Sequence, residues 1–162
     1  MTRLQLGLFT VDVDVDATRR LYQTLENPDP QCCNACATFL LLVERRMLPD
    51  ALVQFMSGAG ITPSKPVEAW GAPDGGFLQV WWEFIGRSTT PGAVVDNTPI
   101  VELEPGVRYT VTDHHPPSSW ALERKQTLPA LEVTWEHDAV RYLEGDAWPE
   151  WLHGERDPEV GA

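Results

Sequence analysis

The segment from Phe77 to Gly86 constrains the fold more than any other part of the chain. One of its faces is entirely apolar and consists of Leu78, Val80, Trp82 and Phe84. The opposite face mixes aromatic, aliphatic and polar residues, namely Phe77, Gln79, Trp81, Glu83 and Ile85. Strict alternation of this kind is typical of a β-strand, and apolar residues on both faces indicate a central strand that is partly covered on both sides.

Four further segments alternate in a similar way and are predicted to be strands: residues 3–11, 100–103, 107–112 and 131–137. They place most of the predicted sheet in the second half of the chain, whereas helical patterns are confined to the first half. We therefore expect an α+β fold, in which two to three N-terminal helices pack on a mainly antiparallel sheet of about five to six strands.

The helical patterns have recognisable ends. Residues 17–25 are predicted to form a short helix capped by Asp16, because a carboxylate before a helix accepts hydrogen bonds from its free N–H groups. A second helix is predicted to begin at Asn34, with a buried stripe of Cys36, Phe39, Leu40, Val43 and Met47. A third is predicted from Pro49 to a glycine stop at Gly58 or Gly60, with a stripe of Leu52, Phe55, Met56 and Ala59.

Length and composition fit one globular domain. With 162 residues, of which 43% are hydrophobic, the chain has enough material for a sizeable core, and we expect a single domain over residues 1–162 whose end, residues 152–162, frays. No apolar run approaches the roughly 20 residues of a membrane helix, and the first six residues lack the apolar region and the cleavage site that are typical of a signal peptide. The sequence therefore predicts a cytoplasmic protein with no membrane partner and with reduced thiols.

The charge of the chain is strongly one-sided. There are 24 acidic side chains against 12 basic ones, which gives a formal net charge of −12. Such a surface repels phosphate backbones, so we expect no nucleic-acid partner. It suits a basic protein partner, although an acidic surface also serves solubility alone.

All three cysteines lie close together in the run Cys32-Cys33-Asn34-Ala35-Cys36. A thiol at the start of a helix meets the positive end of the helix dipole, which favours the reactive thiolate. Cysteine is also among the most buried residue types and often behaves as a small hydrophobic residue. Since Cys36 belongs to the predicted buried stripe, core packing is its plainest role.

A metal or redox site is the alternative for the same cysteines. The spacing of Cys33 and Cys36 suits zinc, with Cys32 as a further thiolate, but a closed site needs four ligands. The balance would have to come from His114, His115, His137 or His153, of which His114 and His115 form an adjacent pair in a predicted loop. The Cys-x-x-Cys spacing also occurs in thiol–disulfide enzymes, although no buried strand precedes it here.

The tryptophans of the chain offer a second kind of candidate site. Those that would line a groove are Trp70, Trp81, Trp82 and Trp120. Trp81 shares the mixed face of its strand with Gln79 and Glu83, so Trp81 and Glu83 are predicted to be exposed to a partner. Near the C-terminus, Trp148 and Trp151 would present two further anchors. Core packing is the competing interpretation, because aromatic residues at strand spacing ordinarily fill sheets.

No catalytic signature accompanies these features. The sequence has no Gly-x-Ser-x-Gly, no glycine-rich phosphate loop and no His-Glu-x-x-His. A histidine directly after Asp113 rarely pairs with that neighbour as a general base. We therefore predict a non-catalytic protein-binding module without a cofactor, and the alternative is a thiol-based zinc or redox site at Cys32, Cys33 and Cys36.

Parts of the chain resemble a group of uncharacterised bacterial proteins. The resemblance lies in the cysteine run, in Phe39, in the segment from Gly60 to Trp70, and in the late strand Leu131–Trp135. Proteins of that group have an aromatic strand ending in a motif similar to Phe84-Ile85-Gly86. The chain departs from the group at Thr62, where an aspartate is usual. Because the group has no established activity, the resemblance implies a fold and no mechanism.

Overall fold

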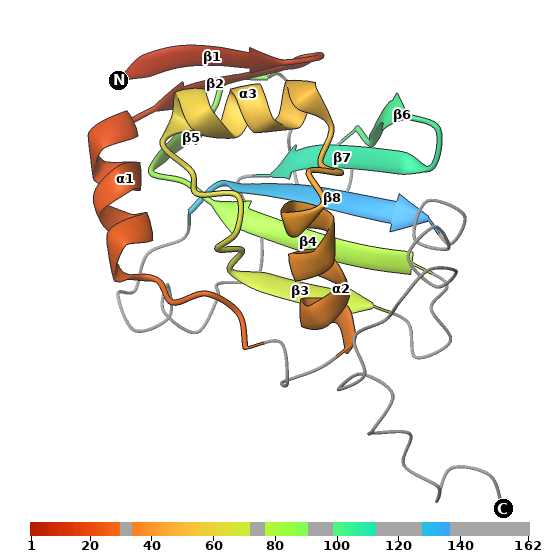
Figure 1. Cartoon of the computed structure of the whole chain (residues 1–162). Coiled ribbons are helices and arrows are strands. Elements are labelled where there is room, and N and C mark those ends of the chain that lie inside the picture. The colour runs from red at the N-terminus through yellow and green to blue at the C-terminus, as the bar shows by residue number, and fades with distance from the viewer. Residues whose placement is uncertain (30–33, 72–76, 91–98, 113–127, 137–162) are drawn as a thin grey trace, which may run out of the picture.

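The computed structural model describes residues 1–29, 34–71, 77–90, 99–112 and 128–136 (Figure 1). Its helices are α1 (Val15–Thr24), α2 (Asn34–Glu44) and α3 (Asp50–Ala59). Its strands are β1 (Thr2–Leu6), β2 (Phe9–Val13), β3 (Glu68–Gly71), β4 (Phe77–Glu83), β5 (Gly86–Ser88), β6 (Val101–Glu104), β7 (Val107–Thr112) and β8 (Ala130–Glu136). The predicted α+β class is confirmed, whereas the predicted frayed end at 152–162 lies outside the described residues.

The strands form two antiparallel sheets. The large sheet has five strands in the order β3-β4-β8-β7-β6, and the small sheet has three in the order β1-β2-β5. In the large sheet β4 lies between β3 and β8, and its register with β8 runs without a break from Phe77 opposite Glu136 to Glu83 opposite Ala130. The interior position that the alternation of β4 predicts is therefore confirmed.

The single strand predicted over residues 3–11 is a hairpin, so that prediction is wrong. Leu6 of β1 pairs with Phe9 of β2, and the chain reverses through Gly7 and Leu8. Gly7 has a φ of +54°, a left-handed conformation that costs other residues roughly 1–2 kcal/mol. The alternating pattern does not reveal this turn, because Leu8 continues the alternating apolar positions of β1.

The predicted strand over residues 77–86 divides between the two sheets. β4 ends at Glu83, and β5 then pairs with β2. Between them, the N–H of Ile85 donates to the Thr18 hydroxyl at 3.0 Å and its carbonyl accepts from the N–H of Asp14 at 2.7 Å. The start of α1 thus satisfies the backbone where the chain passes from one sheet to the other.

The helix ends agree with the sequence at α3 and differ at α1. Gly60 caps α3 in the left-handed conformation, and the predicted stripe of α3 is entirely buried. The N-cap of α1 is Asp14, whose carboxylate accepts from the N–H of Ala17 at 2.9 Å. The prediction of Asp16 as the cap is wrong because α1 begins earlier and includes Asp16 in its first turn.

Helix α2 begins at Asn34 as predicted, but its buried face is rotated. The fully buried positions are Ala37, Thr38, Phe39 and Leu42. Cys36 is half-buried and Met47 is exposed, so the predicted core role of these two residues is wrong. Phe39 belongs to both the predicted and the observed buried face, and its ring meets that of Trp82 edge to face at a centroid distance of 5.6 Å.

The inner faces of both sheets contribute to one core, and helices complete it. In Figure 1, α2 lies across β3 and β4, and α3 lies against β1. Tyr109 of β7 joins the sheets, because its hydroxyl donates to the carbonyl of Leu6 at 3.1 Å and its ring meets Phe9 edge to face at 5.6 Å. The outer faces are turned away from this core, although Trp81 and Glu83 on the outer side of β4 are buried.

Candidate functional site

The cysteine and histidine candidates cannot be joined into a site within the described residues. Cys32, Cys33, His114 and His115 lie outside those residues, as do all other histidines of the chain. Cys36 lies in the first turn of α2 and is half-buried. In the described ranges no three His, Cys, Asp or Glu residues are grouped so as to hold a metal ion. The zinc or redox site stays a prediction.

The prediction that Trp81 and Glu83 are exposed is wrong. Trp81 is 9% exposed and Glu83 is 1% exposed. The hydroxyl of Tyr22 donates to the backbone carbonyl of Glu83 at 2.9 Å, and burial together with the charge of Glu83 raises the pKa of Tyr22 well above its ordinary value. This end of β4 offers little surface to a partner. The other predicted anchors, Trp148 and Trp151, lie outside the described residues.

The outer face of the large sheet is the side turned away from α2. The cross-strand register arranges its side chains in rows. One row contains Glu68, Trp81, Glu132 and Thr110, the next contains Trp70, Gln79, Thr134, Arg108 and Glu102, and a third contains Phe77 and Glu136. We call this set the large outer face.

Trp70 is the prominent side chain of the large outer face. It is 53% exposed and lies on β3, at the margin of the sheet. Phe77 of the neighbouring strand supports it from the side, with ring centroids 5.0 Å apart and an interplanar angle of 66°. This edge-to-face contact is a favourable aromatic geometry that holds the indole in place while leaving much of it open to solvent.

The charges of the large outer face are unequal. Its solvent-reaching carboxylates are Glu68, Glu102, Glu132 and Glu136. Among the described residues of this face, Arg108 is the one cation, and it forms an ion pair with Glu136. Glu132 accepts a hydrogen bond from the Gln79 amide at 2.5 Å, which fixes its carboxylate on the sheet surface. The face as a whole presents negative charge around an exposed indole.

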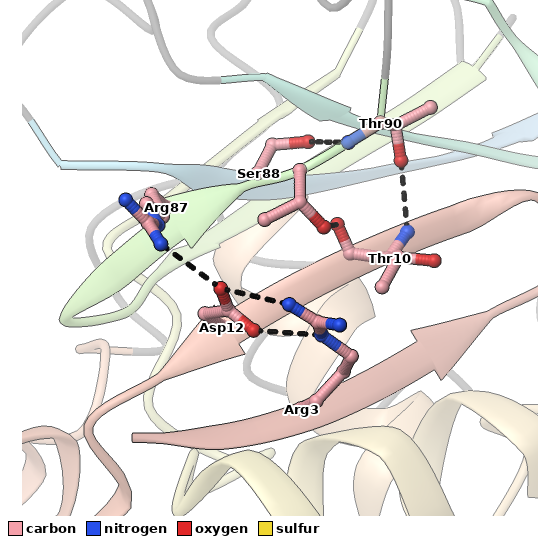
Figure 2. A network of polar contacts seen from close by, with 7 residues as sticks. Arg3, Thr10, Asp12, Arg87, Ser88 and Thr90 are labelled. Atoms are coloured by element: carbon pink, nitrogen blue, oxygen red, sulfur yellow. Dashed lines mark hydrogen bonds and ion pairs between the residues drawn. The ribbon is translucent and has the colours of Figure 1, made fainter.

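The outer face of the small sheet carries a polar network of another kind (Figure 2). Asp12 is the centre of this network, with a side chain that is 11% exposed. It accepts from Arg3 at 3.0 Å and 3.5 Å and from Arg87 at 3.3 Å. The hydrogen bonds from Arg3 hold the pKa of the Asp12 carboxyl below its ordinary value, although burial acts in the opposite direction.

Threonine hydroxyls continue the network along β2. The N–H of Thr10 donates to the Thr90 hydroxyl at 2.8 Å (Figure 2). The carbonyl of Thr10 accepts from the N–H and hydroxyl of Thr89 at 2.8 Å and 3.0 Å. These bonds fasten the chain after β5 to β2. Asp12 and the Thr10 backbone are therefore bonded within the protein, which is the arrangement expected of a structural cluster.

Comparison with protein family models, with curated proteins and with solved structures gave no match. The resemblance to the uncharacterised bacterial group therefore stays an expectation. None of the helices in the described ranges has the length and apolar character that crossing a bilayer requires. Any functional conclusion has to come from the surfaces of the molecule itself.

Proposed function

We propose that this protein is a non-catalytic binding module that uses the large outer face to bind a basic protein. The observation that carries the proposal is the half-exposed indole of Trp70 on an acidic sheet surface. Tryptophan is among the residue types that dominate binding energy at protein interfaces, and it does so by burying a large apolar side chain in the complex. Trp70 is therefore the anchor of the proposed interface.

The surrounding carboxylates give the interface its selectivity. Complementary charge accelerates the encounter of two proteins and penalises partners of the wrong sign. Glu68 and Glu132 lie in the row beside that of Trp70, so a cationic side chain that contacts the indole face also has a carboxylate within reach. The net charge of −12 extends this attraction beyond the contact area.

The proposal predicts a residue-specific loss of binding. On an array of nine-residue peptides of graded charge, the wild-type protein should prefer basic peptides. Trp70→Ala should lower the affinity for these peptides by roughly 30-fold, which corresponds to the loss of about 2 kcal/mol typical of an anchor residue. The substitution leaves the net charge unchanged, so unspecific attraction to a −12 protein would survive it. Affinities are measured by fluorescence anisotropy of labelled peptides.

Leu8→Ala is the matched control. Leu8 is an apolar residue, 47% exposed, at the tip of the small-sheet hairpin and outside the proposed interface. The Leu8→Ala substitution should leave the affinity for basic peptides unchanged. Equal binding by the wild type and the Trp70→Ala variant, or no preference for basic peptides, would contradict the proposed function.

A further inference from the structure

Strand β3 lies at one edge of the large sheet. It pairs with β4 over four consecutive residues, from Glu68 opposite Trp81 to Gly71 opposite Leu78. In the part of the chain that the structure describes, β4 is its one strand neighbour (Figure 1). An edge strand presents a row of backbone N–H and C=O groups on its outer side, which is a ready template for another strand.

The side chains of β3 fit an incoming strand of one particular pattern. Glu68 and Trp70 lie two residues apart and therefore on the same side, and both are exposed. A strand added beside β3 places its own alternate side chains opposite these two, about 4.5–5.5 Å away between Cβ atoms. Opposite a carboxylate and an indole, lysine or arginine is favoured by charge and by cation–π attraction.

The opposite edge of the large sheet is less suited to the same role. The pairing of β6 with β7 is irregular between Glu102 and Glu104, and such irregularities are devices that protect sheet edges. No comparable irregularity occurs along the four paired residues of β3. On the inner side, Gly71 lies close to Ala35 of α2, so the helix braces β3 from behind.

We propose that the partner binds as an extended segment that adds a strand to β3, with basic side chains at alternate positions directed towards Glu68 and Trp70. This inference rests on the proposed function and specifies how the same face recognises its partner. Backbone hydrogen bonds to β3 would supply part of the affinity, and the alternate basic side chains would supply the sequence preference.

Backbone methylation of a peptide tests this mode directly. The probe is an acetylated and amidated nine-residue peptide with lysine at every odd position and valine or threonine at the even positions. Two further copies carry N-methyl groups on two central amides, on odd residues in one copy and on even residues in the other. Since successive N–H groups of a strand point to opposite edges, only one copy loses the donors that would face β3.

The expected result is asymmetric. One methylated copy should bind at least about tenfold more weakly than the parent peptide, and the other within about twofold of it. Equal affinities of the two copies, whether high or low, would overturn strand addition. Failure of the proposed function is distinguished by the unmethylated parent peptide. In that case this peptide would bind the Trp70→Ala variant as tightly as it binds the wild type.

Discussion

On the outer face of the small sheet, Asp12 is bound by both Arg3 and Arg87, and the nearby threonines bond to one another. On the outer face of the large sheet, carboxylates outnumber the described cation and Trp70 stands half exposed beside them. Both surfaces belong to antiparallel sheets that share one core. They differ in charge balance, because on the large outer face Glu132 and Glu136 are bonded within the protein but four carboxylates face one described cation.

Under the proposed function, that difference separates a structural surface from an interaction surface. Charges that already have partners gain little from a ligand, because a new contact must first replace an existing one. An excess of one charge beside an exposed aromatic side chain gains more binding free energy from a ligand, because a partner can supply the opposite charge. The proposed function therefore gives the small sheet a structural role and the large one recognition, and this division can be tested at three positions beyond Trp70.

The largest expected effect is at Gly86, where the chain enters the small sheet. A Cβ at this position would overlap the backbone carbonyl of Asp12 and lie 3.1 Å from the Cα of Val13. Backbone atoms cannot rotate away as a side chain does, so Gly86→Ala should force β5 away from β2. We expect a loss of about 3 kcal/mol in the free energy of unfolding, measured by urea denaturation.

Ser88→Ala is the matched control on the same strand. The position already carries a Cβ, so the substitution removes a hydroxyl without introducing overlap, and it should cost less than about 1 kcal/mol. Similar losses for both variants would show that close approach of β5 to β2 does not limit stability. The small sheet would then lose the structural role that the comparison gives it.

A smaller effect is expected at Tyr109, which joins the two sheets. Tyr109→Phe keeps the edge-to-face contact with Phe9 and removes the hydrogen bond to the carbonyl of Leu6. We expect a loss of about 1 kcal/mol, because a buried acceptor loses its donor. The affinity of the Tyr109→Phe variant for basic peptides should stay that of the wild type; a parallel loss of affinity would mean that recognition depends on the small sheet.

The fold was predictable where one local signal decides the outcome. The ends of α3 follow from Pro49 and Gly60, and the strand over residues 107–112 has the predicted bounds. Strand bounds predicted from alternation were wrong where the chain turns, or passes to the other sheet, while apolar residues still recur at every second position. Leu8 continues the apolar series into a turn, and the crossing at Ile85 is set by α1, which lies far away in sequence.

The candidate site was less predictable, because exposure depends on tertiary neighbours. Alternation correctly places Trp81 on the outer side of β4, yet this indole is buried, and the exposed one is Trp70 on an edge strand that was not predicted. The segment of β3 is short, and its position beside β4 rests on long-range pairing rather than on a local pattern. The acidity of the surface was readable from composition, whereas its distribution over the two sheets was not.

The smallest effect, and the most specific, is the pH dependence of the Asp12 cluster. The pKa of Asp12 is lowered in the folded protein, chiefly by the hydrogen bonds from Arg3, so its stabilising contribution is fully present above the unfolded pKa of about 3.9. It is lost as the pH falls through the folded pKa below that value. Asp12→Asn should therefore be less stable than the wild type near pH 6, and the difference should shrink below about pH 4.

Thermal unfolding of both proteins between pH 2.5 and 6 measures this difference. Introducing Asp12→Asn into an Arg3→Gln background provides the control, because the principal cause of the lowered pKa is then already absent. In that background the pH dependence of the difference should be much reduced. An unchanged dependence would mean that Arg3 does not govern the carboxylate, and that Arg87 alone keeps the pKa of Asp12 low.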